Sequence, residues 1–551
     1  MQQLIECVPN FSEGNDLNII KQITDQIESV EGVRLLNVDP GKATNRTVVT
    51  FVGNPLAVVE AAFRAIKKAG ELIDMTKHKG EHPRMGATDV CPLIPIANIS
   101  MEETAEYAQQ LAKRVGEGLQ IPVYLYEAAQ PNKDRSNLSV IRAGEYEGFF
   151  KKIKQPEWKP DFGPAEFDVK RGATVIGARD FLVAYNVNLN TTSTRRANAV
   201  AFDVREAGRK IKDDSGQMIT VPGTLKYVKA IGWYIEEYGI AQISINLTHI
   251  NLTPVHIAFD EVCRRAEARG LRVTGSELVG LIPLKAMLDA GKYFLRKQQR
   301  SVGVSEKELI KIAVKSLGLD ELGPFKPEEK IIEYMLKNKD DNRLVNMTLS
   351  GFADETAGES PAPGGGSVSA YVGALGISLG TMVANLSSHK KGWNERWEEF
   401  SNWAEKGQQY KDELLRLVDE DTKAFNQIMT AMGLPKGTEE EKVIRAKAIQ
   451  EATKYAIEIP FKVMQAAYES MEVIKAMVET GNPNSITDAG VGALCARSAV
   501  IGAFINVRIN AGGYDDKAFG NDIIAKGKEI EGKAIALEAG IIQYINGKIG
   551  N

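Results

Sequence analysis

This 551-residue sequence has few cysteines and no strong excess of charge of either sign. Its four cysteines, Cys7, Cys91, Cys263 and Cys495, stand far apart and form no CxxC pair. That usage excludes a disulfide framework and predicts reduced, mostly buried thiols in a cytoplasmic protein. The 68 basic and 72 acidic residues leave a net charge of −4, without the basic surface that nucleic-acid binding requires, so no nucleic-acid partner is expected.

Long hydrophobic runs are equally scarce. The first ten residues, MQQLIECVPN, lack the basic start and apolar core of a signal peptide. One uncharged stretch, residues 367–386, is long enough to span a bilayer. Its serine, threonine, asparagine and glycine residues make it only weakly hydrophobic, and small residues suit close packing between helices. We therefore expect a buried core helix and no membrane span.

Strand and helix patterns divide the chain into regions. Residues 1–180 alternate strand-like and helix-like periods, and residues 181–326 repeat a similar order. The strands then stop, since residues 327–345 are predicted to form a helical linker and residues 346–551 are helical in pattern throughout. The predicted fold is two α/β subdomains, each a ferredoxin-like sheet with helices, followed by an all-α helical bundle.

The segment HKGEHPRMGATDVCPLIP, residues 78–95, carries His78 and His82 four residues apart. Histidines at that spacing can share a metal on a helix face, but Gly80 and Pro83 break helices and no third ligand stands at a recognisable spacing, so no metal is expected. A histidine on a glycine-rich loop can instead serve as a general acid or base near neutral pH. A polar loop with one hydrogen-bonded histidine is an equally open interpretation of the residues alone.

A carboxylate falls on the apolar stripe of a predicted helix in the last region. The stripe has the spacing of one helix face and consists of Leu414, Leu417, Val418, Phe425 and Ile428. Asp421 lies on this stripe, whereas Asp419 lies to one side. A carboxylate that points toward a core or pocket must be paired or have a raised pKa, as happens at active sites. The alternative is a misjudged helix phase, with Asp421 at the polar boundary.

The nearby PAPGGGSVSA, residues 361–370, predicts a turn that runs into a helix. Backbone N–H groups at such a helix start can hold a carboxylate, and a flexible connector is the alternative. The candidate supporting residues there are Gly364, Gly365, Gly366 and Ser367.

Several long motifs resemble one enzyme family. ECVPNFSEG, TNRTVVTFVG, the segment at 78–95, PEWKPDFGP and VTGSELVGLIPLKA are similar to glutamate formiminotransferase. In the helical region, SPAPGGGSVSA and LVDEDTKAF are similar to formiminotetrahydrofolate cyclodeaminase. The whole chain therefore resembles the bifunctional formiminotransferase–cyclodeaminases.

This resemblance implies a folate-dependent enzyme of histidine degradation. Such an enzyme transfers the formimino group of N-formimino-L-glutamate to tetrahydrofolate, and then eliminates ammonia from 5-formiminotetrahydrofolate to give 5,10-methenyltetrahydrofolate. Tetrahydrofolate, expected in polyglutamylated form, is the co-substrate, no metal is implied, and a homo-oligomer is expected. Two alternatives remain: a transferase whose helical region serves only oligomerisation, and a non-catalytic folate-binding scaffold.

The resemblance also implies roles for particular residues. His82 matches the proton donor of the transferase, and Asp421 matches the cyclodeaminase carboxylate. Asp39, at a predicted strand end, could orient the imidazole or hold the amidinium, although a turn-forming aspartate explains it as well. In the segment that matches the folate site, Lys170 and Arg171 could pair with folate carboxylates or form a solvated basic turn. That segment comprises Gly163, Pro164, Ala165, Glu166, Phe167, Asp168, Val169, Lys170, Arg171 and Gly172.

Overall fold

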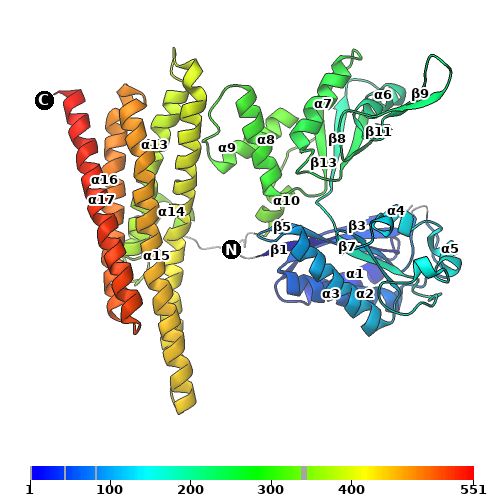
Figure 1. Ribbon diagram of the computed structural model, residues 1–551, viewed down its shortest axis with the longest axis horizontal. Coiled ribbons are helices and arrows are strands. Elements are labelled where there is room, and N and C mark those ends of the chain that lie inside the picture. Colours follow the sequence, from blue (N-terminus) through cyan, green and yellow to red (C-terminus); the bar gives the residue numbers. More distant parts are fainter. Residues whose placement is uncertain (1–2, 42–44, 81–82, 337–343, 551) are drawn as a thin grey trace. The chain divides into compact units, whose positions relative to one another are not determined.

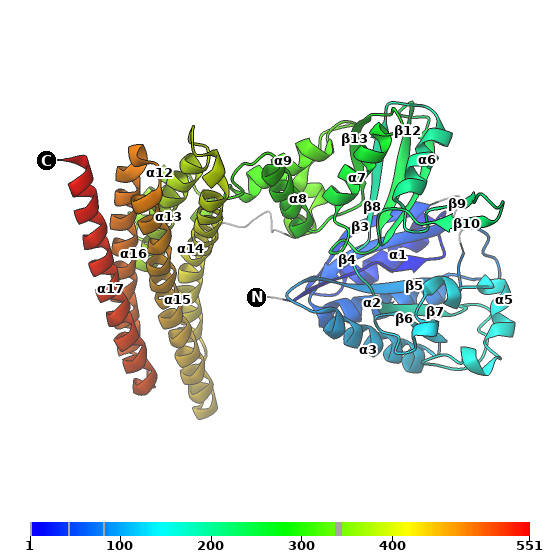
Figure 2. The same ribbon diagram turned by 45° about the horizontal axis from the view of Figure 1, so that its top comes forward.

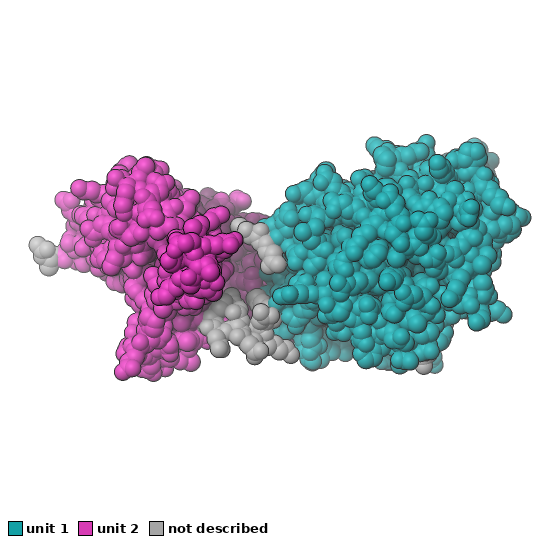
Figure 3. Space-filling model, turned by 90° about the horizontal axis from the view of Figure 1, so that it is seen from below, with its two compact units in different colours: residues 1–286, 317–337 teal, residues 287–316, 338–551 magenta. Residues whose placement is uncertain are grey.

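The computed structural model describes residues 3–41, 45–80, 83–336 and 344–550. Internal packing divides the chain into two compact units, coloured separately in Figure 3. Unit 1 comprises residues 1–286 and 317–337, and unit 2 comprises residues 287–316 and 338–551. Residues 287–316 thus pack with the helical unit, although the sequence pattern places them in the second α/β subdomain.

Unit 1 begins with a seven-stranded sheet. Its strands are β1 (Leu4–Cys7), β2 (Asn10–Phe11), β3 (Val33–Gly41), β4 (Arg46–Gly53), β5 (Thr88–Ala97), β6 (Val123–Glu127) and β7 (Thr174–Ala178). The order is β1-β4-β2-β5-β7-β6, with β3 paired to β4, and only the β5–β7 and β6–β7 pairs are parallel. The predicted strand–helix order is confirmed, and the short β2 and the late β7 complete the sheet.

Three amphipathic helices cover one face of this sheet: α1 (Leu17–Glu28), α2 (Pro55–Leu72) and α3 (Met101–Leu119) (Figure 1). Each begins at a side-chain cap, supplied by Asp16, Asn54 and Ser100 respectively, which satisfies N–H groups of the first turn. Short helices follow β6: η1 (Lys133–Arg135), α4 (Leu138–Ile141), α5 (Glu145–Lys152) and η2 (Pro156–Trp158).

The second subdomain has a four-stranded sheet in the order β11-β12-β8-β13 (Figure 2). Its elements are β8 (Val183–Leu189), α6 (Thr194–Val204), β11 (Val228–Ile235), β12 (Ile240–Leu247), α7 (Val255–Glu267) and β13 (Val273–Val279). The sequence pattern over residues 225–247 predicts a hairpin with a turn near Gly239, and the pairing of β11 with β12 confirms it, with Gly239 at φ 65°. The pattern also predicts a helix over 194–211, which is wrong beyond Val204. Gly208, at φ 57°, instead leads into a hairpin of β9 (Arg209–Lys212) and β10 (Met218–Val221).

The remaining helices of this part of the chain are α8 (Leu284–Lys297), α9 (Glu306–Leu317), α10 (Pro327–Lys330) and α11 (Ile332–Met335). The predicted all-α architecture of the last region is confirmed. Its elements are η3 (Leu344–Asn346), α12 (Leu349–Thr356), α13 (Gly365–Ser388), η4 (Asn394–Arg396), α14 (Trp397–Met432), α15 (Glu439–Thr480), η5 (Pro483–Ser485), α16 (Ile486–Gly512) and α17 (Lys517–Ile549).

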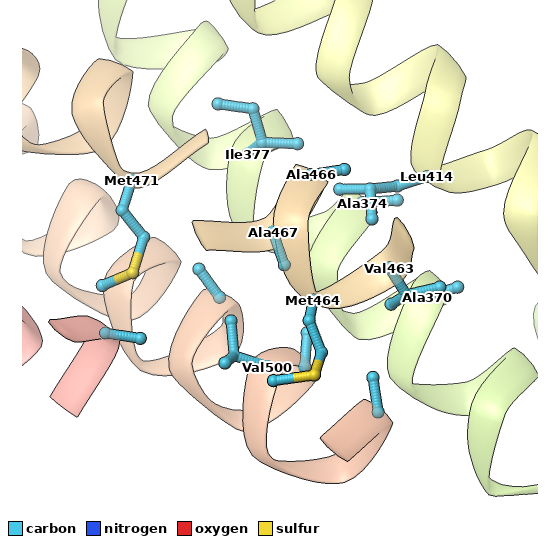
Figure 4. Close-up of a cluster of buried hydrophobic side chains, with 14 of the residues drawn as sticks. Ala370, Ala374, Ile377, Leu414, Val463, Met464, Ala466, Ala467, Met471 and Val500 are labelled. Atoms are coloured by element: carbon cyan, nitrogen blue, oxygen red, sulfur yellow. The ribbon is translucent and has the colours of Figure 1, made fainter. Parts of the chain in front are cut away.

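Small side chains let the long helices of unit 2 approach closely. Figure 4 shows Ala370, Ala374, Ala466 and Ala467 among larger apolar side chains of the buried cluster. Close helix approach at small residues maximises van der Waals contact along the bundle. Two helical segments, Gly365–Ser388 and Pro483–Gly512, are long and apolar enough to cross a membrane by length and composition. In the bundle 61% and 50% of their most apolar windows are buried, and core helices of soluble proteins pass the same test.

Candidate active sites

Polar side chains gather on the face of the first sheet opposite α1, α2 and α3. Asn10 lies opposite Val48 and Val90, Asp39 also lies opposite Val48, and Arg46 lies opposite Gly41. Residues directly opposite in a sheet share a face, and positions two apart along a strand do as well. Asn10, Asp39 and Arg46 are therefore neighbours on one face, and Asp39 is exposed.

The segment between α2 and β5 borders these residues. His82 lies outside the described residues, but His78 is described and lies in a non-helical stretch, as predicted. Arg84 Nε donates to His78 Nδ1 at 3.1 Å, so the ring proton is on Nε2, which donates to the carbonyl oxygen of Asn45 at 2.8 Å. Both ring nitrogens of His78 thus have hydrogen-bond partners.

Arg84 and Asn45 hold this segment from two sides. The Arg84 side chain is only 8% exposed and donates to both carboxylate oxygens of Glu147 at 2.9 and 2.7 Å. These bonds hold the pKa of Glu147 below its usual value. Asn45 donates from Nδ2 to the carbonyl oxygen of Lys79 at 3.0 Å and accepts from the Gly14 N–H at 3.0 Å. The position of the segment is therefore set by residues distant in sequence.

Asp89 lies beneath the same segment and is fully buried. Its Oδ1 accepts from the Met85 N–H at 3.0 Å, and its Oδ2 lies 3.0 Å from Arg142 Nη2. Burial raises the pKa of Asp89, and the positive charge of Arg142 opposes that rise. Oδ1 is thus hydrogen-bonded, whereas Oδ2 has the ion pair with Arg142 but no hydrogen bond.

The predicted folate segment, residues 163–172, runs beside the segment that follows α2. Gly172 forms an isolated β-bridge with Gly86, and the Met75 N–H donates to the carbonyl oxygen of Lys170 at 2.9 Å. The sequence pattern places this segment between the two α/β subdomains. It instead connects β6 to β7 within the first sheet, because β7 pairs with β5 and β6.

The two cations of this segment have different surroundings. Arg171 donates from Nε to Asp168 at 2.6 Å, from Nη1 to the Leu119 carbonyl at 2.8 Å, and from Nη2 to the Gln120 carbonyl at 3.2 Å. These bonds attach the segment to the C-terminal end of α3, so the Arg171 guanidinium already binds groups of the protein itself. The Lys170 side chain is exposed and is the better placed of the two to meet an incoming carboxylate.

The second sheet has a buried polar face that the sequence reasoning missed. Gln242 donates to Asn188 Oδ1 at 2.8 Å, Asn188 donates to Glu321 at 2.6 Å, and Trp233 donates to Gln242 at 3.2 Å. Asn188 and Gln242 are fully buried. The signal was available, because polar residues alternate with Val, Ile and Leu along both β8 and β12.

A third polar group joins the two subdomains of unit 1. Glu6, on the polar face of the first sheet, is 3% exposed. Burial raises its pKa to about 7 despite the positive charge of Arg179. Nearby in the chain, Asp180 lies 3.0 Å from His249 Nδ1. The contact between Asp180 and His249 joins residues of different subdomains, so no local pattern in the sequence indicates it.

In unit 2, Asp421 lies on α14 against the first turn of α13. Ser367 Oγ is 3.1 Å from Asp421 Oδ2, 2.9 Å from the Val418 carbonyl oxygen and 3.2 Å from Thr422 Oγ1. Burial raises the pKa of Asp421, while hydrogen bonds from the Ser367 hydroxyl and N–H oppose the rise. The predicted helix phase is confirmed, since Leu414, Leu417 and Val418 are fully buried.

The glycine run before Ser367 has a packing role. A Cβ atom on Gly366 would lie 2.5 Å from Asp421 Cγ, whereas one on Gly364 would meet only a carbonyl oxygen at 3.7 Å. A Cβ atom on Gly365 would lie 3.3 Å from Asn506 Nδ2. Asp419, the other candidate carboxylate, accepts from the Leu344 N–H at 2.7 Å and so fastens η3 to α14. Asp421 thus accepts a hydrogen bond from the start of α13, and Asp419 accepts one from η3.

A small cavity of about 30 Å³ lies among η3, α12, α13 and α14, and neither Asp419 nor Asp421 is among its lining residues. It is lined by Leu344, Val345, Met347, Thr348, Leu349, Phe352, Tyr371 and Val418. Across the described ranges of both units, no group of three or more histidine, cysteine, aspartate or glutamate side chains is arranged to hold a metal ion.

Known protein families match consecutive parts of the chain. The family described as "Formiminotransferase domain, N-terminal subdomain" matches residues 4–179, and "Formiminotransferase domain" matches residues 184–337. "Formiminotransferase-cyclodeaminase" matches residues 348–529.

Individual relatives match either the whole chain or one region of it. The formimidoyltransferase-cyclodeaminase of Gallus gallus is 46% identical over 520 residues, which is 94% of each chain. The glutamate formimidoyltransferase of Thermoplasma acidophilum is 44% identical and covers 53% of this chain and 92% of its own length. The methenyltetrahydrofolate cyclohydrolase of Methylorubrum extorquens is 38% identical and covers 37% of this chain and 98% of its own length.

Proposed function

Because the chain belongs to the formimidoyltransferase-cyclodeaminase family, we propose that it transfers the formimino group of N-formimino-L-glutamate to tetrahydrofolate and then eliminates ammonia from the product. The observation that carries this proposal is the similarity to a bifunctional relative along 94% of both chains. A glutamate formimidoyltransferase aligns with about half of the chain, so the two activities correspond to separable parts.

In the transferase reaction, N5 of tetrahydrofolate attacks the formimino carbon and a tetrahedral adduct forms. The bond from that carbon to the glutamate nitrogen then breaks, and this nitrogen leaves as an amine that must gain a proton. We assign that proton to His82, and a positioned general acid is typically worth about 10² to 10⁴ in rate. Arg84 and Asn45 support this role, because they anchor the segment on both sides of position 82.

In the cyclodeaminase reaction, N10 of 5-formiminotetrahydrofolate attacks the same carbon and closes a ring. Ammonia leaves after protonation, and 5,10-methenyltetrahydrofolate results. Asp421 suits this step because burial raises its pKa, so the neutral acid that donates a proton is more populated than in water. Neither reaction requires a metal chemically, since protonation of the departing nitrogen is the demanding event in each.

Product analysis on the purified full-length protein tests this function. Glutamate, ammonia and methenyltetrahydrofolate are measured separately after mixing formiminoglutamate with tetrahydrofolate. We expect equal amounts of all three. Glutamate without ammonia would leave a transferase whose helical unit serves only oligomerisation, and folate binding without any product would indicate a non-catalytic scaffold.

A second activity of the helical unit follows from one similarity. The methenyltetrahydrofolate cyclohydrolase of Methylorubrum extorquens aligns over 98% of its length with 37% of this chain. Opening of the methenyl ring by water would consume the product of the deaminase step. Incubation of the protein with methenyltetrahydrofolate alone tests for hydrolase activity. If the protein is a cyclodeaminase without this activity, the methenyl absorbance decays at the same rate as in buffer.

We propose that the folate is polyglutamylated and that Lys170 meets its tail. The exposed ammonium of Lys170 supports this, since Arg171 is bonded to Asp168 and to backbone carbonyls. Replacement of Lys170 by Met should raise KM for tetrahydrofolate pentaglutamate more than KM for the monoglutamate. Equal changes for both folates would remove Lys170 from the tail site.

We also propose a cytoplasmic homo-oligomer that does not span a membrane. Exposed apolar residues at helical spacing on α13 and α16 support contact between copies of the chain. They are Leu375, Met382, Leu386, Val491, Leu494, Ile505 and Ile509, the last of them 73% exposed. Light scattering on detergent-free protein measures the oligomer, and cell fractionation tests the compartment. A protein that stays in the membrane fraction until detergent is added would contradict this proposal.

A further inference from the structure

Arg46 is a cation whose guanidinium has no hydrogen-bonding partner among the described residues. No residue that the structure describes accepts a hydrogen bond from its guanidinium, and its Nε is buried and unpartnered. Burial lowers the pKa of Arg46, although the negative charges of Asp89 and Asp39 act on it from a distance. Leaving a largely buried cation unpaired is costly unless an anion arrives from outside the protein.

The buried carboxylate whose charge acts on Arg46 does not fill this role. Asp89 is fully buried, but its Oδ1 accepts from the Met85 N–H and its Oδ2 pairs with Arg142 at 3.0 Å. Arg84, the other buried cation of this region, is bonded to Glu147 and His78. Among the described residues Arg84 and Arg142 each have an ion-pair partner, although the Arg142 Nε is also buried without a hydrogen-bond partner. Arg46 is the one of these three arginines for which the described residues supply neither an ion pair nor a hydrogen bond.

Asn10 adds an acceptor to the same place. It is 4% exposed, its Nδ2 donates to the Val8 carbonyl at 2.8 Å, and its Oδ1 is buried without a partner. Asn10 lies opposite Val48 on β4, two residues along the strand from Arg46. A diagonal pair of this kind is separated by about 7 to 8 Å across one face of a sheet. A donor and an acceptor that both lack partners thus stand within reach of one small molecule.

A ligand that satisfies both must present an anion to Arg46 and an N–H group to Asn10. N-formimino-L-glutamate has both, as its carboxylates lie a few bonds from its formimino N–H groups. We propose that Arg46 binds a carboxylate of formiminoglutamate while Asn10 accepts a hydrogen bond from its formimino nitrogen. This inference rests on the proposed function, and it identifies residues that bind the amino-acid substrate.

The position of Arg46 favours the amino acid over the folate tail. The neighbouring residue, Asn45, accepts a hydrogen bond from His78 at 2.8 Å and holds Lys79 at 3.0 Å, so Arg46 borders the segment that carries His82. The carboxylates of formiminoglutamate must lie close to the reacting carbon. Those of folate lie at the far end of its pteridine and benzoyl groups, well away from N5.

Steady-state kinetics of glutamate release by the full-length protein test this inference. We compare Arg46→Met, Arg46→Lys and Asn10→Leu with Arg34→Met, which removes an exposed arginine from β3 of the same sheet. The expected result for Arg46→Met is an increase of about 10- to 100-fold in KM for formiminoglutamate, the usual range for one charged hydrogen-bonded contact. KM for tetrahydrofolate should change less than about twofold, and Arg34→Met should match the wild type.

Two substrate analogues sharpen the test. N-formiminoglycine retains only the carboxylate next to the nitrogen that carries the formimino group. N-formimino-4-aminobutyrate retains only the distal carboxylate. The wild type should prefer whichever analogue keeps the carboxylate that Arg46 binds, and Arg46→Met should lose that preference. Calorimetric titration with L-glutamate, which shares both carboxylates, should show weakened binding to Arg46→Met and should detect a site even in variants with low turnover.

Two outcomes would overturn the inference. An increase in KM for tetrahydrofolate alone would place the folate carboxylates at Arg46. Unchanged kinetics in Arg46→Met, with an active wild type, would show that Arg46 is only a structural charge, while the proposed function would stand. A folding defect, which circular dichroism detects, is separated from a binding defect by Arg46→Lys, which keeps the positive charge. Its single ammonium cannot make a bidentate contact, so it should not restore the wild-type KM.

Discussion

The two candidate sites differ in what holds their key groups in place. In unit 1 the segment that carries His82 is held by long-range hydrogen bonds, such as the contact of Arg84 with Glu147, 63 residues away in sequence. In unit 2, Asp421 and Ser367 lie on two long helices whose close approach depends on the absence of a side chain at Gly366. The site built on loops in unit 1 therefore depends on hydrogen bonds from polar side chains. The site built on helices in unit 2 depends on small side chains that let the two helices approach.

The same difference extends to the charges. The unit 1 site contains several arginines and carboxylates that largely compensate one another, which keeps Asp89 and Glu147 paired. In unit 2 the hydrogen bonds that Asp421 receives within the described part of the chain come from Ser367, a neutral residue. A carboxylate without a nearby cation keeps the raised pKa that proton donation needs.

The largest effect is expected from adding volume to the helix-built site. In Gly366→Ala the new Cβ would lie 2.5 Å from Asp421 Cγ, so the carboxylate or α13 must move. Ammonia release should fall about 100-fold or more, because a displacement near 1 Å at a reacting group costs that much. Glutamate release should stay near the wild-type rate.

The comparison variant is Gly364→Ala, whose Cβ would meet only a carbonyl oxygen at 3.7 Å. Its loss of ammonia release should be at least tenfold smaller. Equal losses in the two variants would mean that the glycine run matters for chain flexibility and not for the approach of Asp421.

A smaller effect on activity is expected from removing a polar partner in unit 1. Arg84→Met breaks the bonds to His78, Glu145 and Glu147. Arg84 is buried but the side chains of Glu145 and Glu147 are 43% and 64% exposed, so its loss should destabilise unit 1 by about 1 to 2 kcal/mol. Glutamate release should slow about tenfold, and ammonia release from 5-formiminotetrahydrofolate should not change. Denaturant unfolding followed by circular dichroism measures the first change, and separate product assays measure the others.

Lys77→Met is the matched control on the same segment. Lys77 is 83% exposed on its side chain and pairs with Asp74 at 3.3 Å, so its replacement should change stability by less than about 0.5 kcal/mol. A stability loss in Lys77→Met as large as that in Arg84→Met would contradict the role of Arg84 as an anchor.

The smallest effect on activity and the clearest pH dependence are expected at Glu6. Because its pKa is raised from 4.5 to about 7 in the folded protein, the folded state keeps a proton there that the unfolded chain releases. Stability from this group is therefore present below pH 4.5 and is lost as the pH rises toward 7, by at most about 3 kcal/mol. Glu6→Gln should flatten this part of the stability profile and gain stability at pH 8.

Thermal unfolding between pH 4 and pH 8 measures this change, with Glu28→Gln on the exposed end of α1 as the control. A Glu6→Gln profile that falls as steeply as the wild-type profile would show that other groups carry the pH dependence of unit 1.

Local patterns in the sequence predict much of the fold. The apolar spacing and the capping residue Ser100 define α3, and alternation around Gly239 defines the β11–β12 hairpin. The pattern fails at residues 205–211, where a helix-like run of polar residues instead enters the β9–β10 hairpin. Propensity alone could not show this, because the helix ends where the chain must turn at Gly208.

The candidate sites are only partly predictable, for a physical reason. The inward direction of Asp421 follows from the helix period, so the sequence indicates it. The isolated position of Arg46, the commitment of Arg171 to the end of α3 and the contact between Gly366 and Asp421 depend on segments that meet only after folding. The need for a residue without a side chain at position 366 is therefore visible only in the folded bundle.

The measurement that tests the central claim of two separate sites most directly is a product-resolved assay of His82→Ala, Asp421→Asn and Asp419→Asn. His82→Ala should stop glutamate release but still liberate ammonia from supplied 5-formiminotetrahydrofolate. Asp421→Asn should release glutamate at the wild-type rate and no ammonia, whereas Asp419→Asn, whose carboxylate holds Leu344, should keep most of both activities. Loss of both products in either His82→Ala or Asp421→Asn, with the fold intact, would contradict the division of the two reactions between the two units.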